Sequence, residues 1–113
     1  MTGTVRGVIV LPVDAPGGRT ARVLVEVRNT SVADAPSVVV GSQVQTGVPL
    51  TPGGRIPFTV VIPDLDPRDT YGLRVHVDLA GTGLVERGDL INTQVSPVEA
   101  RNADRLVAHV RPV

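Results

Sequence analysis

The chain has 113 residues, and its eleven basic residues balance eleven acidic ones. This length suits one domain with a single core, and the neutral balance disfavours a nucleic-acid partner, which a protein attracts through a positive field. Because there is no cysteine, disulfides, thiolate catalysis and thiolate metal ligands are excluded.

Valine carries most of the apolar content, while prolines and glycines recur along the chain, and this combination favours strands joined by tight turns. Apolar and polar residues alternate with period two in seven runs, each bounded by Gly, Pro, Asn or Asp. The pattern predicts an all-β fold, a seven-stranded antiparallel immunoglobulin-like β-sandwich with a tyrosine corner, in one domain over residues 1–113. The predicted strands cover residues 4–11, 20–29, 37–45, 55–62, 71–79, 90–95 and 105–111, and the segments DAPGG and TPGG predict hairpin turns.

The tyrosine of this prediction is Tyr71, the only one in the chain, which opens a predicted strand in the segment LDPRDTYGLRV. In immunoglobulin-like sandwiches a tyrosine at this place folds back so that its hydroxyl bonds the backbone a few residues upstream. Leu65, Pro67 and Tyr71 have the spacing of such a corner, and Pro67 stiffens the turn. We predict a structural role for Tyr71, against the alternative of a catalytic or ligand-stacking tyrosine, because it is the first residue of a strand.

Several stretches follow the order found in a known family. They are the opening residues 2–5, VEVRNTSVADAP, IPFTV, LDPRDTYGLRV, GDLINTQVSPV and a last strand that ends in RPV. In these stretches the chain resembles the YbaY-type small bacterial envelope lipoproteins, which include the YscW-like pilotins of type III secretion. The resemblance implies a β-sandwich with no known enzymatic activity, and in the pilotin branch it implies a secretin subunit as the protein partner.

Residues suited to catalysis or metal binding are few. The phase of their strands places His76 and His109 on solvent-facing sides, and no serine lies in a Gly-x-Ser-x-Gly turn, so no catalytic residue is predicted. Asp64, Asp66 and Asp69 share one predicted loop and could hold calcium. Turn chemistry, in which aspartate side chains accept backbone N–H groups, explains them more simply, so no metal or cofactor is predicted.

Some apolar residues fall in the solvent-facing phase of the strands. If those strands share a sheet, its outer surface carries an apolar patch of the kind that marks a protein partner. An exposed sheet edge within residues 38–45 is a second candidate, through addition of a partner strand. The alternatives are scattered surface valines or an error of one residue in phase. The predicted interface consists of Val8, Val10, Leu24, Val39 and Val61.

The location depends on how the chain begins. No run approaches the roughly 18 apolar residues of a membrane-spanning helix, and MTGTVRGVIVLPV predicts a strand rather than a signal peptide. We expect the cell envelope if the chain is a processed lipoprotein and the cytoplasm if Met1 is the native start. The predicted function is a non-enzymatic protein-binding or assembly module of the bacterial cell envelope; the alternative is a cytosolic or homo-oligomeric β-sandwich domain.

Overall fold

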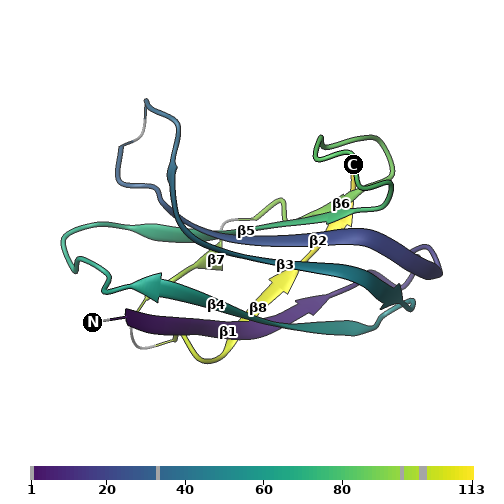
Figure 1. Cartoon of the computed structure of the whole chain (residues 1–113), viewed down its shortest axis with the longest axis horizontal. Helices are drawn as coiled ribbons and strands as arrows, with labels where there is room; N and C mark the ends of the chain where they lie inside the picture. The colour runs from purple at the N-terminus through teal and green to yellow at the C-terminus, as the bar shows by residue number, and fades with distance from the viewer. Residues whose placement is uncertain (1, 33, 95, 100–101) are drawn as a thin grey trace.

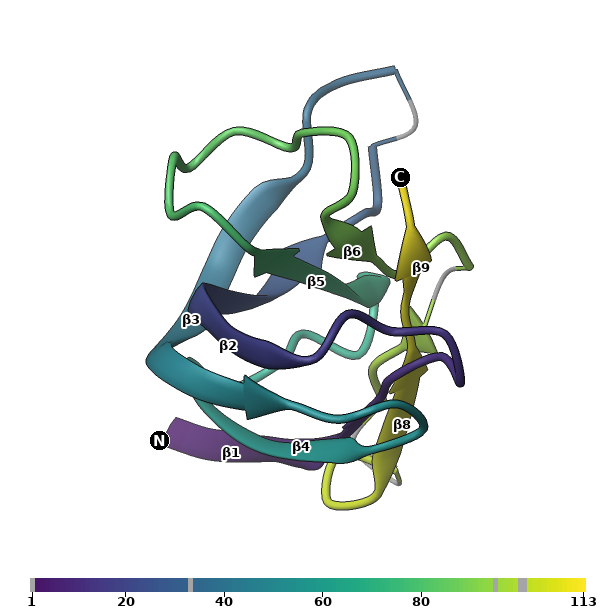
Figure 2. The same ribbon diagram turned by 90° about the vertical axis from the view of Figure 1, so that its right-hand side faces the viewer.

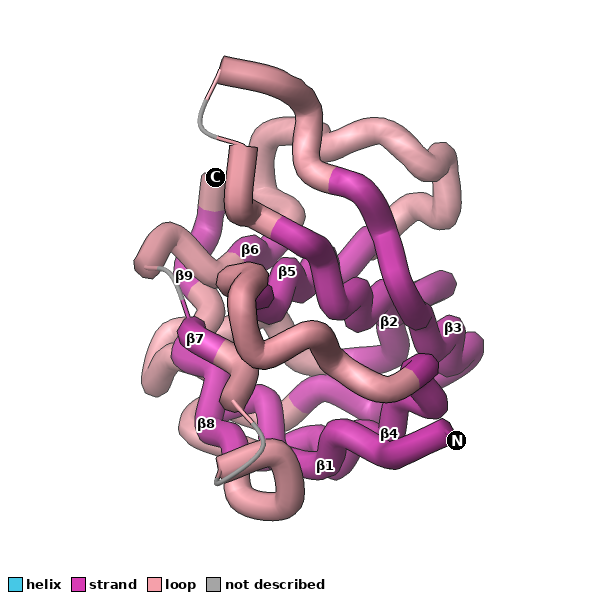
Figure 3. The backbone as a smooth tube through the Cα atoms, turned by 90° about the vertical axis from the view of Figure 1, so that its left-hand side faces the viewer, coloured by secondary structure: helices cyan, strands magenta, loops and turns pink. Residues whose placement is uncertain are grey.

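Every regular element in the described part of the chain is a β-strand, as Figure 1 and Figure 3 show. The computed structural model describes residues 2–32, 34–94, 96–99 and 102–113. No helix in these ranges is long and apolar enough to cross a membrane. The all-β prediction is therefore confirmed. The strands are β1 (Thr2–Val10), β2 (Gly18–Asn29), β3 (Val38–Leu50), β4 (Arg55–Pro63), β5 (Tyr71–Asp78), β6 (Leu90–Ile91), β7 (Ser96–Pro97), β8 (Leu106–His109) and β9 (Arg111–Pro112).

The strands form two sheets that pack face to face. The small sheet has the order β4-β1-β8, and the large sheet has the order β3-β2-β5-β6-β9 with β7 paired to β5. Figure 1 shows the two layers one above the other. The pairing of β1 with β8 is parallel, so the expectation of an entirely antiparallel sandwich was wrong. The hairpin predictions for DAPGG and TPGG were also wrong, because these segments connect β1 to β2 and β3 to β4, which lie in different sheets.

The core fills the space between the facing sides of the sheets. Along β4 buried and exposed residues alternate strictly, as the period of two predicts. Val23, Val25 and Val27 of β2 are fully buried, and Phe58 of β4 is buried with them. Each such side chain contributes about 1.5–3 kcal/mol relative to an exposed one, so aliphatic packing is the main source of stability.

The last two predicted strands are shorter in the structure than the sequence predicts. The run at 105–111 becomes β8 in the small sheet and β9 in the large sheet, and the backbone N–H of Val110 between them donates to Val10 (3.2 Å). The run at 90–95 yields only β6, and Val95 lies outside the described residues. Asn92 explains why β6 ends, because its side-chain amide bonds the N–H of Val75 and the carbonyl of Leu73, both at 2.7 Å. The side chain of Asn92 thus takes the place of the next backbone hydrogen bonds between β5 and β6.

Two glutamines connect the sheets on the side where β3 and β4 meet. The side chain of Gln45 donates to the carbonyl of Pro57 (2.9 Å), and that of Gln43 accepts the N–H of Thr59 (3.1 Å). These bonds use backbone groups of β4, while the backbone of β3, which includes the predicted edge at 38–45, pairs with β2 alone among the described strands.

The turn from β4 to β5 carries the chain from the small sheet to the large one, and Tyr71 lies at its end. The Tyr71 hydroxyl accepts a hydrogen bond from the backbone N–H of Asp66 (3.0 Å), five residues upstream. The ring is half-buried and packs against the core together with Leu65, while Pro67 is exposed. This geometry is that of the predicted corner; its effect on stability remains a prediction.

Replacing Tyr71 with phenylalanine is expected to lower the free energy of unfolding by about 1 kcal/mol, because it removes one hydrogen bond and keeps the ring. Thermal denaturation should show this as a fall in Tm of roughly 4–8 °C. Asp66→Asn is the matched control, since it leaves the backbone N–H of residue 66 in place. A Tyr71→Phe variant as stable as the wild type would contradict the corner role.

Candidate functional site

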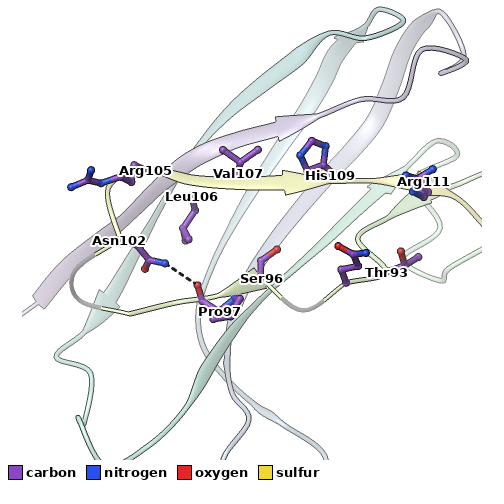
Figure 4. Close-up of a pocket in the computed structure, with 10 residues that line it drawn as sticks. Thr93, Ser96, Pro97, Asn102, Arg105, Leu106, Val107, His109 and Arg111 are labelled. Carbon is purple, nitrogen blue, oxygen red and sulfur yellow. Dashed lines mark hydrogen bonds between the residues drawn. The ribbon is translucent and has the colours of Figure 1, made fainter.

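A groove runs along one edge of β8, between this strand and the segment that contains β7. Its volume is about 620 Å³. In Figure 4, Leu106 points from β8 toward Pro97 on the opposite wall, while Val107 and His109 point to the other side of the strand. The amide of Asn102 closes one end by donating to the carbonyl of Pro97 (3.3 Å). The lining residues are Thr93, Gln94, Ser96, Pro97, Asn102, Arg105, Leu106, Val107, His109 and Arg111.

Among the described strands, none pairs with β8 on the side that faces the groove. Successive residues of a strand direct their N–H and C=O groups to opposite edges. Val110 donates to Val10 of β1, so Leu106 and Ala108 also face β1, and the backbone groups of Val107 and His109 face away from it. Further along this outer edge β6 pairs with β9, but β8 itself ends the sheet order among the described strands. The groove therefore exposes a short stretch of open sheet edge.

The groove is basic. Arg105 and Arg111 line it, and no carboxylate does so in the part of the chain that the structure describes. Asp104 lies nearby and forms an exposed ion pair with Arg105 (3.5 Å). A surface pair of this kind contributes little, so Arg105 remains available to a negative ligand.

The predicted apolar interface does not form one surface. Val8, Val10 and Val61 belong to the small sheet, whereas Leu24 and Val39 belong to the large one. The premise that these strands share a sheet was therefore wrong, although an interface role for either group stays a prediction. Figure 2 shows the two sheets as separate layers.

Val8 nevertheless has apolar neighbours on the small sheet. In register it lies between Pro57 of β4 and Val107 of β8. These three residues line a shallow hollow on the outer face of that sheet, and the hollow shares Arg105, Leu106 and Val107 with the groove. The basic groove and this apolar hollow thus adjoin along β8.

The second cluster of polar residues is buried, and it includes a histidine whose place was predicted wrongly. His76 is in the outward phase of β5, yet it is only 4% exposed because the loop from 79 to 89 folds over this end of the large sheet (Figure 2). Its Nε2 lies 2.8 Å from a carboxylate oxygen of Asp89. The nitrogen donates in this bond, because an ionised carboxylate can only accept. His109, in contrast, is exposed as predicted.

Two aspartates hold this loop by accepting its backbone N–H groups. Asp78 accepts from Gly81 (2.9 Å), Thr82 (3.3 Å) and Gly83 (2.8 Å). Asp89 accepts from Leu79 (3.1 Å) and Glu86 (3.0 Å) in addition to His76. The sequence signal that could have revealed this is an aspartate at the end of a strand followed by glycines at the third and fifth positions, a pattern that favours side-chain capping of a turn.

Burial raises the pKa of Asp89, but hydrogen bonds from His76 and from the backbone of Glu86 and Leu79 outweigh this effect, so the pKa lies below its ordinary value of 3.8. Ligand atoms of His76, Asp78 and Asp89 lie within 4.8 Å of one another, close enough to meet at a metal ion. The N–H donors already directed at both carboxylates serve the aspartates as anions, however, and a cation would have to displace them. We therefore interpret the cluster as a structural anchor for the loop.

The aspartates suggested for calcium do not converge. Asp66 accepts from the guanidinium and the backbone N–H of Arg68, and these bonds hold the pKa of Asp66 below its usual range. Asp69 accepts from the side-chain amide of Asn29 (3.0 Å). Of the described residues, the trio with His76 is the one group whose ligand atoms come together, and neither Asp66 nor Asp69 nor Asp64 belongs to it.

Comparison with known proteins gives one informative similarity. No protein-family model matches the sequence. No curated protein matches it either. The structure is similar to that of an alternative pilotin from the type II secretion system of Vibrio cholerae, with a TM-score of 0.73 and 16% sequence identity over 100% of both chains. The chain therefore has a pilotin-like β-sandwich fold.

Proposed function

We propose that this chain is a non-enzymatic protein-binding module of the bacterial cell envelope that assists the assembly of a secretion system. The observation that carries the proposal is the structural similarity to a pilotin, which covers 100% of both chains. The basic groove with its open sheet edge supports it, because strand edges and adjoining apolar surface are a common means of binding another protein. A secretin subunit is the proposed partner, and membership of the YbaY-type lipoproteins, with its YscW-like branch, is the proposed kinship.

The proposal predicts that deletion of the gene lowers the amount of secretin multimer in the outer-membrane fraction, and that the wild-type gene restores it. Quantitative immunoblotting of unheated membrane samples measures the multimer directly. We expect the chain to co-purify with the secretin subunit from the same cells. Unchanged multimer levels in the deletion strain would contradict the proposal.

Self-association is the alternative outcome, and light scattering coupled to size exclusion separates the two. A monomer that forms a complex only when the secretin subunit is added agrees with the proposed function. A stable homo-oligomer that excludes the secretin subunit would favour the alternative of a self-associating β-sandwich.

A further inference from the structure

We propose that the groove beside β8 binds an extended, acidic segment of the partner protein, which adds a strand to the open edge of β8. The inference rests on the proposed function, because it assigns the chemistry of the partner and the place where it binds. Three features of the groove carry it, namely the edge of β8 that no described strand pairs, the charge of the lining and the polar opposite wall.

The edge of β8, which no described strand pairs, favours an extended ligand. N–H and C=O groups of Val107 and His109 face the groove, spaced two residues apart as in any sheet edge. A helix has no free backbone groups along its length to match them, whereas an extended peptide has both donors and acceptors at the same repeat. Strand addition therefore satisfies the edge and places alternate side chains of the ligand on opposite faces of the sheet.

The charge of the groove selects acidic side chains. Arg105 and Arg111 mark the two ends of the lining contributed by β8 and β9. Six residues of extended chain span about 20 Å, so a ligand of roughly this length reaches both arginines. Guanidinium groups bind carboxylates through paired hydrogen bonds, so the contact fixes the orientation of the carboxylate as well as attracting it.

The opposite wall is neutral and polar, so it is compatible with an acidic peptide that lies along the groove. It presents Thr93, Gln94, Ser96 and Asn102. None of these side chains carries a charge that would repel carboxylates, and hydroxyl and amide groups can bond either a peptide backbone or an acidic side chain. Val107 points to the outer face of the small sheet, so it lies next to those side chains of the ligand that point to the same face.

The test uses an eight-residue peptide of alternating valine and glutamate with blocked ends, titrated into the ¹⁵N-labelled chain. We expect the amide resonances of Val107 and His109 to shift, and we expect the peptide to bind about tenfold more tightly than its valine–lysine counterpart. Raising the salt concentration should weaken binding, because the arginines are exposed. Equal binding of the two peptides, or shifts confined to other strands, would overturn the proposal.

Two sets of variants separate charge from backbone. Replacing both Arg105 and Arg111 with serine is expected to lower the affinity for the acidic peptide about tenfold. Arg55→Ser is the control, because it removes an exposed arginine from β4 at the opposite edge of the small sheet, and it should change the affinity less than about twofold. Val107→Pro removes an N–H that faces the groove but no bond to β1, so the fold should survive and binding should be lost. If Val107→Pro proves unstable, the arginine variants decide the question.

The result also distinguishes this inference from the function on which it rests. A Val107→Pro chain that folds but still restores secretin multimers to the deletion strain would overturn the groove as the binding site and leave the proposed function intact. Deletion without any effect on the multimers would remove the proposed function itself, whatever the peptide does.

Discussion

Replacing Asp89 with alanine is expected to lower the free energy of unfolding by about 3–5 kcal/mol, a large share of the ~5–15 kcal/mol typical of a domain. The Asp89 side chain is buried, and its carboxylate accepts from the backbone of Leu79 and Glu86 and from the ring of His76. Alanine leaves all three donors without this acceptor, and the one on His76 is buried. Urea denaturation at neutral pH, followed by circular dichroism, measures the loss.

The same residue makes the free energy of unfolding depend on pH, with a loss of stability in acid. The pKa of Asp89 in the folded chain is lower than its ordinary value of 3.8, which applies to the unfolded chain. Folding therefore gains stability from this carboxylate at every pH above about 5, and the gain is lost as the pH falls below 3.8 and through the folded value. Asp89→Asn has no carboxylate to titrate, so the difference in unfolding free energy between wild type and variant should be largest at pH 7 and smaller at pH 3.

Asp104→Asn is the matched control for both measurements. Its carboxylate pairs with the side chain of Arg105, but it is 77% exposed. We expect Asp104→Asn to change the free energy of unfolding by at most about 0.5 kcal/mol and to leave its dependence on pH as in the wild type. If Asp89→Ala and Asp104→Asn are equally stable, the loop from 79 to 89 is not held by the buried carboxylate.

The alternation of residues was enough to predict most of the sandwich, and the exceptions share a physical cause. On β2 and β4 the period of two marks the core correctly, since these strands have one side toward the other sheet and one toward solvent. On β5 the rule fails at His76 and Asp78, which are buried although they face outward. A loop that folds back over its own sheet buries residues by tertiary contact, and no local period records that contact.

The groove could not be predicted from the pattern either. Its edge exists because the last strand leaves the small sheet at Val110 and continues as β9 in the large one. The sequence shows one uninterrupted run from 105 to 111, because a strand that changes sheets keeps its alternation. The Tyr71 corner was accessible to prediction for the opposite reason, since its hydrogen bond joins residues only five positions apart.

Replacing Gly7 with alanine is expected to destabilise the chain by about 1–3 kcal/mol, and by more if the backbone cannot shift. Gly7 lies in the middle of β1, with Phe58 of β4 and Leu106 of β8 directly opposite in register. A Cβ atom at this position would collide with the backbone oxygen of Leu106 and come within 2.8 Å of the Phe58 ring. Glycine is required here by close approach, because the ring occupies the space that a side chain would take.

Gly3→Ala is the matched control for this change, because Gly3 lies on the same strand and a Cβ there meets nothing within 4 Å. It should be neutral or slightly stabilising, since alanine restricts the unfolded chain. Adding Phe58→Leu to Gly7→Ala is expected to recover only part of the loss, because the smaller side chain relieves the contact with the ring but not the contact with the Leu106 carbonyl. A double-mutant cycle measured by urea denaturation gives this coupling.

The strain caused by Gly7→Ala should displace β8, so a substitution in the core should also affect the groove. The rigid contact is with the backbone of Leu106, so Gly7→Ala has to push β8 away from β1. We expect shifted amide resonances at Val107 and His109 and weaker binding of the acidic peptide, without any change to a residue that lines the groove. A Gly7→Ala chain with wild-type stability and an unshifted β8 would show that the small sheet yields more easily than its packing indicates.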